Sequence, residues 1–415
     1  MKAPASVQSR VLSLLYSPTG GAGLTILRNE ISADRGFTIE PRAPSRPTAK
    51  PSYLTLAEID QDQGQLWLAR RIRAEYGASV FADAWSAPAF MKTNDSAIRG
   101  GTLCGVPGTK CRSGDWRQAY ADYLTQYAKE YAAAGVPLTY VGPENETTIA
   151  PPQDSMIMSA AQTANFMGIL GAALARSGVS TRAECCASIS WKVAQQFAAG
   201  IRTDKAANRA TALLTSHGYF AAPDSPLRGW SKPVWETEWA PFGFQAWDGA
   251  WDDGSPSSGF TWAQNIDNGL TAANLSGFFY LWGADTTGMT GPNTGLVDVK
   301  GDSVDASGRL WAFAGYSRFV RPGAVRIGAI TSDAQLEVSA FRNRDGSIAV
   351  VALNRARRGQ TTTFSVRGLG RARVTSYLTD SAHQLTAQIP TRLDNGTFDA
   401  TQPPRSLVTY EIRSP

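Results

Sequence analysis

The sequence has few of the side chains from which metal sites are built. Among 415 residues there are two histidines and four cysteines, and no two cysteines form a Cys-x-x-Cys pair. Zinc sites need several such ligands at short spacings, so this composition argues against one. A phosphate-binding glycine-rich loop and a Gly-x-Ser-x-Gly elbow are also missing, which argues against nucleotide-dependent and serine-hydrolase chemistry. We expect neither a metal nor another cofactor.

Long apolar runs and concentrated charge are missing too. No stretch approaches the ~18 consecutive apolar residues of a membrane span, and the first eight residues have no apolar segment of a signal peptide. Charged residues make up 18% of the chain, the net charge is +5, and the arginines are scattered. This pattern does not favour nucleic-acid binding. We therefore expect no membrane and no nucleic-acid partner.

Tryptophan, by contrast, is abundant, with twelve residues within an aromatic content of 10%. Flat aromatic rings can cover the C–H faces of sugars, so this composition fits a carbohydrate-binding surface as well as an ordinary core. Trp247, Trp251 and Trp262 show the ambiguity, since each fits core packing or the rim of a substrate groove.

The four cysteines fall into two pairs. Cys104 and Cys111 lie in a glycine-rich loop that can close as a short disulfide, which would indicate an oxidising compartment. Cys185 and Cys186 are adjacent on a predicted strand. There we expect two buried small side chains, one on each side of the strand.

Strands and helices alternate along most of the chain. The predicted strands cover residues 24–29, 79–85, 138–141, 183–188, 213–219, 234–239 and 277–282, and the predicted helices cover residues 7–16, 63–76, 116–134, 156–177, 191–199 and 261–274. Strands separated by helices pair in parallel through crossovers. Seven such strands favour an α/β fold of the (β/α)8-barrel type over an open doubly wound sheet.

From residue 323 the pattern changes to short strands separated by turns. These strands cover residues 325–330, 336–341, 348–353, 361–366, 373–378 and 406–412. The segment Asn343-Arg344-Asp345-Gly346 is typical of a hairpin turn. We therefore predict a (β/α) barrel over residues 1–322 and an antiparallel side β-sandwich over residues 323–415.

Two predicted strands run directly into carboxylates. Glu144, Asn145 and Glu146 follow residues 138–141, and residues 234–239 contain Glu236 and Glu238. On the second strand alone, alternation of buried tryptophan with exposed glutamate explains the pattern equally well. Further polar or aromatic side chains stand near strand ends, namely Arg28, Trp85, His217, Tyr219 and Trp282. In a barrel these ends share the face on which active sites lie.

Glycoside hydrolysis with retention needs two carboxyl groups about 5 Å apart. Glu146 and Glu238 lie near the ends of two strands that face one another across a barrel, so we predict that they form this pair. Glu144 should point to the opposite face from its neighbour, and Glu236 should lie ~7 Å deeper than Glu238 at the usual strand rise. His217 fits a structural histidine as well as a substrate contact.

The chain resembles glycoside hydrolase family 30 over nearly its whole length. The resemblance rests on residues 25–29 (Thr-Ile-Leu-Arg-Asn), 83–94 (Asp-Ala-Trp-Ser-Ala-Pro-Ala-Phe-Met-Lys-Thr-Asn), the Cys104 loop with 113–116 (Ser-Gly-Asp-Trp), 143–146 (Pro-Glu-Asn-Glu), 216–219 (Ser-His-Gly-Tyr), 237–239 (Thr-Glu-Trp), 309–313 (Arg-Leu-Trp-Ala-Phe) and 318–323 (Arg-Phe-Val-Arg-Pro-Gly). It implies a (β/α)8 barrel with a side β domain, and a retaining mechanism on a β-linked polysaccharide.

The resemblance also implies roles for the site residues. Glu146 would protonate the leaving oxygen and then deprotonate the incoming water, and Glu238 would attack the anomeric carbon. Asn145 would bind the 2-hydroxyl of the sugar. The residues expected to keep Glu238 charged and oriented are Arg28 and Tyr219, and those expected to form the walls of the sugar subsite are Trp85 and Trp282.

The function that this resemblance favours is a secreted, retaining endo-β-glycanase that hydrolyses plant cell-wall xylan. Xylan is favoured because the cysteine loop and the strand with Cys185 and Cys186 are most similar to the fungal-type xylanases of the family. An endo-β-1,6-galactanase or β-1,6-glucanase with the same mechanism is an alternative. We expect a monomer whose partner is the polysaccharide or oligosaccharide substrate.

Three departures from the family bear on these expectations. The sequence begins at what resembles the first barrel helix, so we expect the first barrel strand to be missing, with unpaired edges on its neighbours. A scaffold truncated in this way and unable to hydrolyse carbohydrate, but still able to bind it, is the competing hypothesis. Thr147 stands where the family has proline, and Glu30 where a second arginine is expected. The extra carboxylate disfavours glucuronate-decorated xylan.

Overall fold

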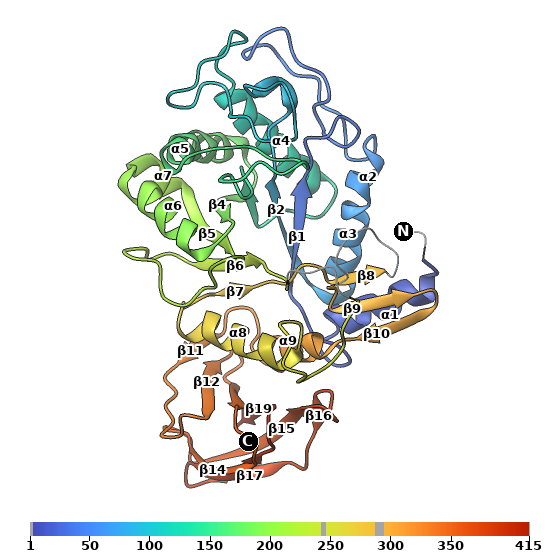
Figure 1. The fold of residues 1–415 in the computed structure, drawn as a ribbon, viewed down its shortest axis with the longest axis vertical. Coiled ribbons are helices and arrows are strands. Elements are labelled where there is room, and N and C mark those ends of the chain that lie inside the picture. Colours follow the sequence, from blue (N-terminus) through green and yellow to red (C-terminus); the bar gives the residue numbers. More distant parts are fainter. Residues whose placement is uncertain (1–2, 242–245, 287–293, 415) are drawn as a thin grey trace. The chain divides into compact units, whose positions relative to one another are not determined.

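The computed structural model describes residues 3–241, 246–286 and 294–414 (Figure 1). The chain divides into two compact units. The first comprises Ile26–Trp239 and Ala272–Phe279, and the second comprises Lys2–Thr25, Ala240–Thr271 and Tyr280–Pro415. The predicted domain boundary at residue 322 stays a prediction. None of the described helices has the length and apolar character needed to cross a membrane.

A parallel sheet forms the centre of the first unit. Within the described residues it has seven strands in sequence order, and every neighbouring pair is parallel. The strands are β1 (Ile26–Ile31), β2 (Ser79–Ala84), β3 (Tyr140–Gly142), β4 (Arg182–Ser188), β5 (Thr211–His217), β6 (Val234–Glu238) and β7 (Gly277–Phe278). No pairing joins β7 to β1 in the described part of the chain. The predicted barrel-type sheet of seven strands is confirmed.

Helices lie in each connection from β1 to β5 (Figure 1). They are α3 (Gln65–Tyr76), α4 (Arg117–Ala133), α5 (Ala160–Ser177), α6 (Trp191–Thr203) and α7 (Lys205–Ala210), with the short α2 (Asp60–Gln63) and the 3-10 turn η1 (Ala89–Met91). A capping box between Ser159 and Gln162 starts α5, so this helix begins four residues after its predicted start. The side chain of Ser190 caps α6 in a similar way.

The space inside the sheet is apolar at one level and polar at the next. Phe81, Tyr140 and Leu213 pack together there. Because side chains alternate along a strand, Asp83 and Thr215, two residues further on, enter the same space nearer the carboxyl ends of their strands. The apolar level therefore forms the floor beneath a polar layer.

The second unit contains α1 (Ala5–Tyr16), α8 (Gly259–Thr271) and α9 (Gly308–Ser317). It also has a small sheet of β8 (Ala284–Thr286), β9 (Val297–Lys300) and β10 (Ser303–Ala306), which the sequence did not lead us to expect. The predicted strand over residues 277–282 is shorter and ends at Phe278. Trp251 and Trp262 are buried in this unit, so these two side chains serve packing.

An antiparallel sheet completes the second unit. Its strands are β11 (Val325–Ile327), β12 (Leu336–Arg342), β13 (Ile348–Asn354), β14 (Gln360–Ser365), β15 (Arg371–Thr379), β16 (Thr386–Ala387), β17 (Thr391–Asp394), β18 (Thr397–Gln402) and β19 (Ser406–Arg413). All six predicted strands are present, and Gly346 N–H donates to the Asn343 carbonyl at 3.1 Å in the predicted turn. Strands β17 and β18 were missed because few of their side chains are apolar, with Leu393 and Phe398 the buried anchors.

Candidate active site

The carboxyl ends of the parallel strands bring together six of the predicted site residues, namely Arg28, Asn145, Glu146, His217, Tyr219 and Glu238. His217 ends β5 and Glu238 ends β6, whereas Glu146 lies in the loop after β3. Arg28 differs from its expected place at a strand end, because β1 continues to Ile31 and puts Arg28 in mid-strand. All six belong to the first compact unit.

Glu238 is held by three side chains. Its Oε2 accepts a hydrogen bond from Nη1 of Arg28, and its Oε1 accepts one from the Tyr219 hydroxyl at 3.1 Å. Nε2 of His217 lies 3.8 Å from Oε2. Burial alone would raise the pKa of Glu238, but attraction to His217 and Arg28, with the hydrogen bonds, lowers it below its ordinary value. Glu238 is therefore an ionised carboxylate at neutral pH.

Arg28 is the centre of a charged network. Its Nε and Nη2 donate to the two carboxylate oxygens of Asp83 at 2.9 and 2.6 Å, and Nη2 also donates to Oδ1 of Asn145 at 2.7 Å. Burial opposes the charge of Arg28, but Asp83 and Glu238 raise its pKa well above the ordinary value. The bidentate pair fixes the plane of the guanidinium group, and hence the direction of Nη1 toward Glu238.

Asp83 is a site residue that sequence reasoning missed. It is an acidic side chain near the end of β2, whose other residues are mostly apolar, and it is almost fully buried. A buried charge needs a partner of opposite sign. The signal available in the sequence was therefore an acidic residue on an otherwise apolar strand, which predicts a cationic partner inside the fold.

Glu146 faces Glu238 across His217. Nδ1 of His217 lies 2.8 Å from Oε1 of Glu146. One carboxylate oxygen of each glutamate and one ring nitrogen of His217 all lie within 4.8 Å of one another. His217 is fully buried, and its Nε2 atom has no hydrogen-bond partner among the described residues. His217 therefore lies between the two acids, and its role as a structural histidine or a substrate contact stays a prediction.

A glycine sets the approach of β5 to β6 beside these residues. Gly218 lies between His217 and Tyr219, and a Cβ atom at Gly218 would meet the ring of Trp239 at 2.2 Å. The N–H of Gly218 donates to the carbonyl of Glu238 at 3.2 Å. Close backbone contact therefore fixes the separation of the histidine, tyrosine and glutamate.

The other two glutamates are engaged elsewhere. Glu144 is fully buried and accepts a hydrogen bond from the hydroxyl of Thr163 on α5 at 2.7 Å. Burial raises the pKa of Glu144 to about 8. Glu236 is also fully buried, accepts from the N–H of Phe279 at 3.1 Å, and has its pKa raised by burial. Both carboxyls are buried and hydrogen-bonded within the fold, outside the pair of Glu146 and Glu238.

The two tryptophans predicted to line the sugar subsite differ in their surroundings. Trp85 directly follows β2 and is half-buried in the first unit. Trp282 is 48% exposed and belongs to the second unit. The subsite roles of both residues stay predictions.

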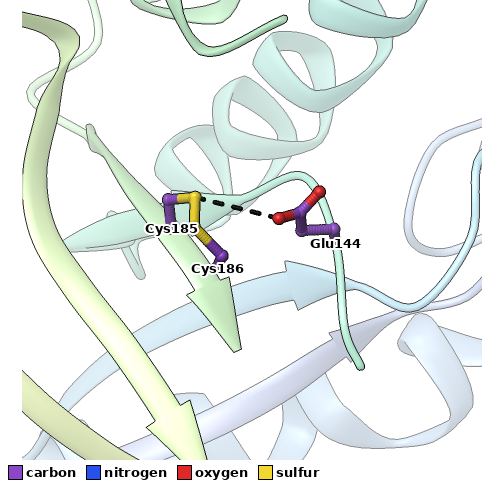
Figure 2. Close-up of side chains that lie close together, drawn as sticks. All are labelled: Glu144, Cys185 and Cys186. Atoms are coloured by element: carbon purple, nitrogen blue, oxygen red, sulfur yellow. Dashed lines mark hydrogen bonds between the residues drawn. A yellow bond between two sulfur atoms is a disulfide. The ribbon is translucent and has the colours of Figure 1, made fainter. Parts of the chain in front are cut away.

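Both cysteine pairs are disulfides. The predicted bond between Cys104 and Cys111 is present, with their Cα atoms 5.5 Å apart. Cys185 and Cys186 are buried as expected. The expectation that they lie on opposite sides of the strand was wrong, because these neighbours are bonded to each other (Figure 2). The expectation assumed a regular strand, but the pairing of β4 with β5 shifts register between Cys185 and Ser188. An irregular strand does not place consecutive side chains on opposite faces.

Possible metal ligands gather at two places in the described chain. One group is Glu144 with Cys185 and Cys186, and the other is Glu146 with His217 and Glu238. In the first group the disulfide leaves no thiolate to bind a metal. In the second, the Arg28 guanidinium already neutralises Glu238. The second arrangement fits acid–base and nucleophilic chemistry by the side chains themselves.

An open (β/α) barrel with a buried, ionised glutamate facing a second glutamate at its strand ends is the architecture of a glycoside hydrolase. The model of the glycosyl hydrolase family 30 TIM-barrel domain matches residues 53–222, and that of the family 30 beta sandwich domain matches residues 323–410. The chain belongs to glycosyl hydrolase family 30. The family assigned by resemblance is thus confirmed.

Three relatives show the range of the similarity. The catalytic domain of the GH30 xylanase C from Talaromyces cellulolyticus is 42% identical with a TM-score of 0.90, over 100% of this chain and 93% of that one. The glucuronoxylanase XynC of Bacillus subtilis is 23% identical over 351 residues, 82% of this chain and 75% of that protein. The lysosomal acid glucosylceramidase of Mus musculus is 25% identical over 313 residues, 70% of this chain but 59% of that protein. The chain therefore spans less than two thirds of the length of the glucosylceramidase.

Proposed function

We propose that this protein is a retaining endo-β-glycanase that hydrolyses xylan. The observation that carries the proposal is the pair of Glu146 and Glu238, whose nearest carboxylate oxygens lie within 4.8 Å of each other. Retaining glycosidases hold their two carboxyls about 5–5.5 Å apart, so that one of them reaches the anomeric carbon, whereas inverting enzymes leave a wider gap for water.

In the first step Glu238 attacks the anomeric carbon, and a covalent glycosyl–enzyme bond forms as the glycosidic bond breaks. Glu146 gives its proton to the leaving oxygen at the same time. Arg28 and Tyr219 donate hydrogen bonds to Glu238 and keep it ionised and aimed. In the second step water attacks the anomeric carbon, Glu146 accepts the proton of the water, and Glu238 leaves.

Asn145 has an amide oriented for substrate binding. Its Oδ1 accepts from Arg28 at 2.7 Å, so Nδ2 remains as a donor to the sugar. A donor next to the acid/base suits the 2-hydroxyl of the sugar under attack, where hydrogen bonds strengthen in the transition state.

The preference for xylan rests on the relatives and on Glu30. The relative at 42% identity is a xylanase, and the Bacillus subtilis relative is a glucuronoxylanase. Burial and the carboxylates of Asp154 and Asp83 raise the pKa of Glu30 to about 7, against an attraction to Arg28. Above this pKa the Glu30 carboxyl is ionised, and its negative charge then repels a glucuronate substituent. Xylan without acidic decoration is therefore the substrate we favour.

The disulfides support an oxidising compartment. Cys104–Cys111 and Cys185–Cys186 are both oxidised, and disulfides persist in oxidising environments such as the cell exterior. We accordingly place the activity outside the reducing cytosol, with the polysaccharide as partner.

The test is release of reducing ends from xylan, β-1,6-galactan and β-1,6-glucan by the wild type, Glu146→Gln and Glu238→Gln. The exposed Glu75→Gln serves as the matched control. We expect release from xylan by the wild type and the control, loss in both active-site variants, and the β-anomer as the first product seen by proton NMR. A first product of the α-anomer, or full activity of Glu238→Gln, would contradict the proposal. Binding of xylooligosaccharides without release would favour the carbohydrate-binding alternative.

A further inference from the structure

The loop that carries Glu146 is attached to the end of β4 at two points. The N–H of Glu146 donates to the carbonyl of Ala187 at 2.9 Å. Two residues earlier, Oε1 of Glu144 lies 3.8 Å from Sγ of Cys185 (Figure 2). Ala187 directly follows the Cys185–Cys186 disulfide. One attachment point is therefore a sulfur atom of the disulfide, and the other is the residue that follows it.

In the contact between Glu144 and Cys185, Glu144 is the group that donates the hydrogen. A disulfide sulfur carries no proton, so the hydrogen of this contact comes from the carboxyl of Glu144. Burial raises the pKa of Glu144 to about 8, so this carboxyl is protonated at neutral pH and can donate to the weak sulfur acceptor. Its other oxygen accepts from Thr163 at 2.7 Å. Glu144 thus joins the loop to both α5 and the disulfide.

The backbone at the second attachment point has an unusual conformation. Glu146 has a φ of 48° and Ala187 a φ of 42°, values in the left-handed region that residues with a Cβ seldom adopt. The N–H of Ala187 donates to the hydroxyl of Thr215 at 2.8 Å, and this hydroxyl donates to Glu184 at 2.5 Å. Such conformations persist when their surroundings hold them in place. The bond between Cys185 and Cys186 is one covalent part of those surroundings.

We propose that the Cys185–Cys186 disulfide is a positioning element for Glu146, which fixes the Ala187 carbonyl to which the Glu146 backbone is bound. This inference rests on the proposed function, in which Glu146 is the acid/base. Both sulfur-bearing side chains are at most 1% exposed, so the bond lies beneath the site and does not touch substrate. Without it, Ala187 relaxes, the hydrogen bond to Glu146 lengthens, and the proton is delivered less well to the leaving oxygen.

The first experiment compares Cys185→Ser/Cys186→Ser with Cys104→Ser/Cys111→Ser, which removes the other disulfide and serves as the matched control. Two substrates separate proton delivery from general damage. Xylan has a poor leaving group that needs protonation, whereas 2,4-dinitrophenyl β-xylobioside has one that leaves without it. In the first variant we expect kcat/KM to fall about 100-fold on xylan, in the range of lost acid catalysis, and less than about threefold on the aryl glycoside.

Azide provides a second readout of the same step. It replaces water without needing a general base, so it should accelerate turnover of the aryl glycoside by Cys185→Ser/Cys186→Ser and leave the control unaffected. Equal losses on both substrates, or an unchanged kcat/KM on xylan, would overturn the inference. If Glu146→Gln and Glu238→Gln abolish wild-type activity while the cysteine variant is unaffected, the proposed function stands and this inference alone fails.

Hydrogen–deuterium exchange tests the inference without reference to activity. The wild type is treated with dithiothreitol, which breaks the S–S bond, supplies two electrons and two protons to the sulfurs, and closes to its own cyclic disulfide. Cys104→Ser/Cys111→Ser, with Cys185–Cys186 as its remaining disulfide, is treated in parallel. We expect amide exchange in residues 144–149 to accelerate at least about tenfold on reduction in both proteins. Mass spectrometry shows when Cys185 and Cys186 have become thiols. If protection from exchange is then unchanged, the inference is overturned. This test does not require that Cys185→Ser/Cys186→Ser folds.

Discussion

Arg28 and Asp83 form a bidentate ion pair inside the open barrel, with Nε to Oδ1 at 2.9 Å and Nη2 to Oδ2 at 2.6 Å. The third guanidinium nitrogen meets Glu238. Asp83 therefore acts on Glu238 only through Arg28, since the position of Nη1 depends on the plane that Asp83 fixes. This relationship makes a carboxylate on β2 part of the environment of a glutamate on β6.

Replacement of Asp83 by Asn should lower kcat/KM on xylan by about 10–100-fold, because Arg28 loses its charged partner and its fixed orientation. The measurement is steady-state kinetics combined with a double-mutant cycle that includes Arg28→Lys. We expect the two losses to be strongly non-additive, as for groups in one network. The exposed Asp60→Asn is the control and should behave as the wild type. Additive losses would show that Asp83 acts independently of Arg28.

Replacement of Tyr219 by Phe should shift the pH dependence of the reaction. The Tyr219 hydroxyl donates to Glu238 at 3.1 Å and helps to lower the pKa of that carboxyl. Without this donor the pKa of Glu238 rises, and protonated Glu238 cannot attack. The acidic limb of the profile of kcat/KM against pH should therefore move to higher pH, and kcat should fall several-fold. Tyr76→Phe, at the end of α3, should leave the profile in place.

Replacement of Glu144 by Gln should change how stability depends on pH. Burial raises the pKa of Glu144 from 4.5 to about 8, so the folded protein binds a proton that the unfolded chain releases in this window. Wild-type stability should thus fall as pH rises from 4.5 to 8, by up to about 1.4 kcal/mol per pH unit from this group.

Urea unfolding of the wild type and Glu144→Gln at pH 5, 6.5 and 8 measures this effect. Glutamine cannot ionise, so the stability of the variant relative to the wild type should increase steadily across the series. A constant difference between the two proteins would mean that Glu144 ionises without cost in the fold.

Removal of the Cys104–Cys111 bond should affect stability more than chemistry. The cysteines are seven residues apart, and closing a loop of this size stabilises a fold by about 2–3 kcal/mol in the chain-entropy model. Cys104→Ala/Cys111→Ala should accordingly unfold at lower urea concentration while keeping kcat on xylan. A matching loss of kcat would show that this loop takes part in the reaction.

Local patterns in the sequence determined the elements and several of the important side chains. Apolar runs bounded by glycine and proline predicted the strands, and their alternation with helices predicted parallel pairing. Glu146 and Glu238 stood out because a carboxylate at or just beyond the end of a largely apolar strand is unusual. The hairpin of β17 and β18 was missed because most of its side chains are polar, and its strands depend on pairing with β15 and β14.

Only the tertiary structure decided which of these side chains meet. Arg28 and Glu238 are 210 residues apart, and their contact depends on the register of every strand between them. The same register places His217 between the two glutamates and makes Asp83 a partner of Arg28. It also buries the side chain of Glu144 inside the fold. The Cys185–Cys186 bond likewise depends on an irregularity where β4 pairs with β5. The sequence by itself thus determined most of the residues of the site, whereas the packing of strands distant along the chain added Asp83 and decided which residues meet, because contacts of this kind leave no local pattern.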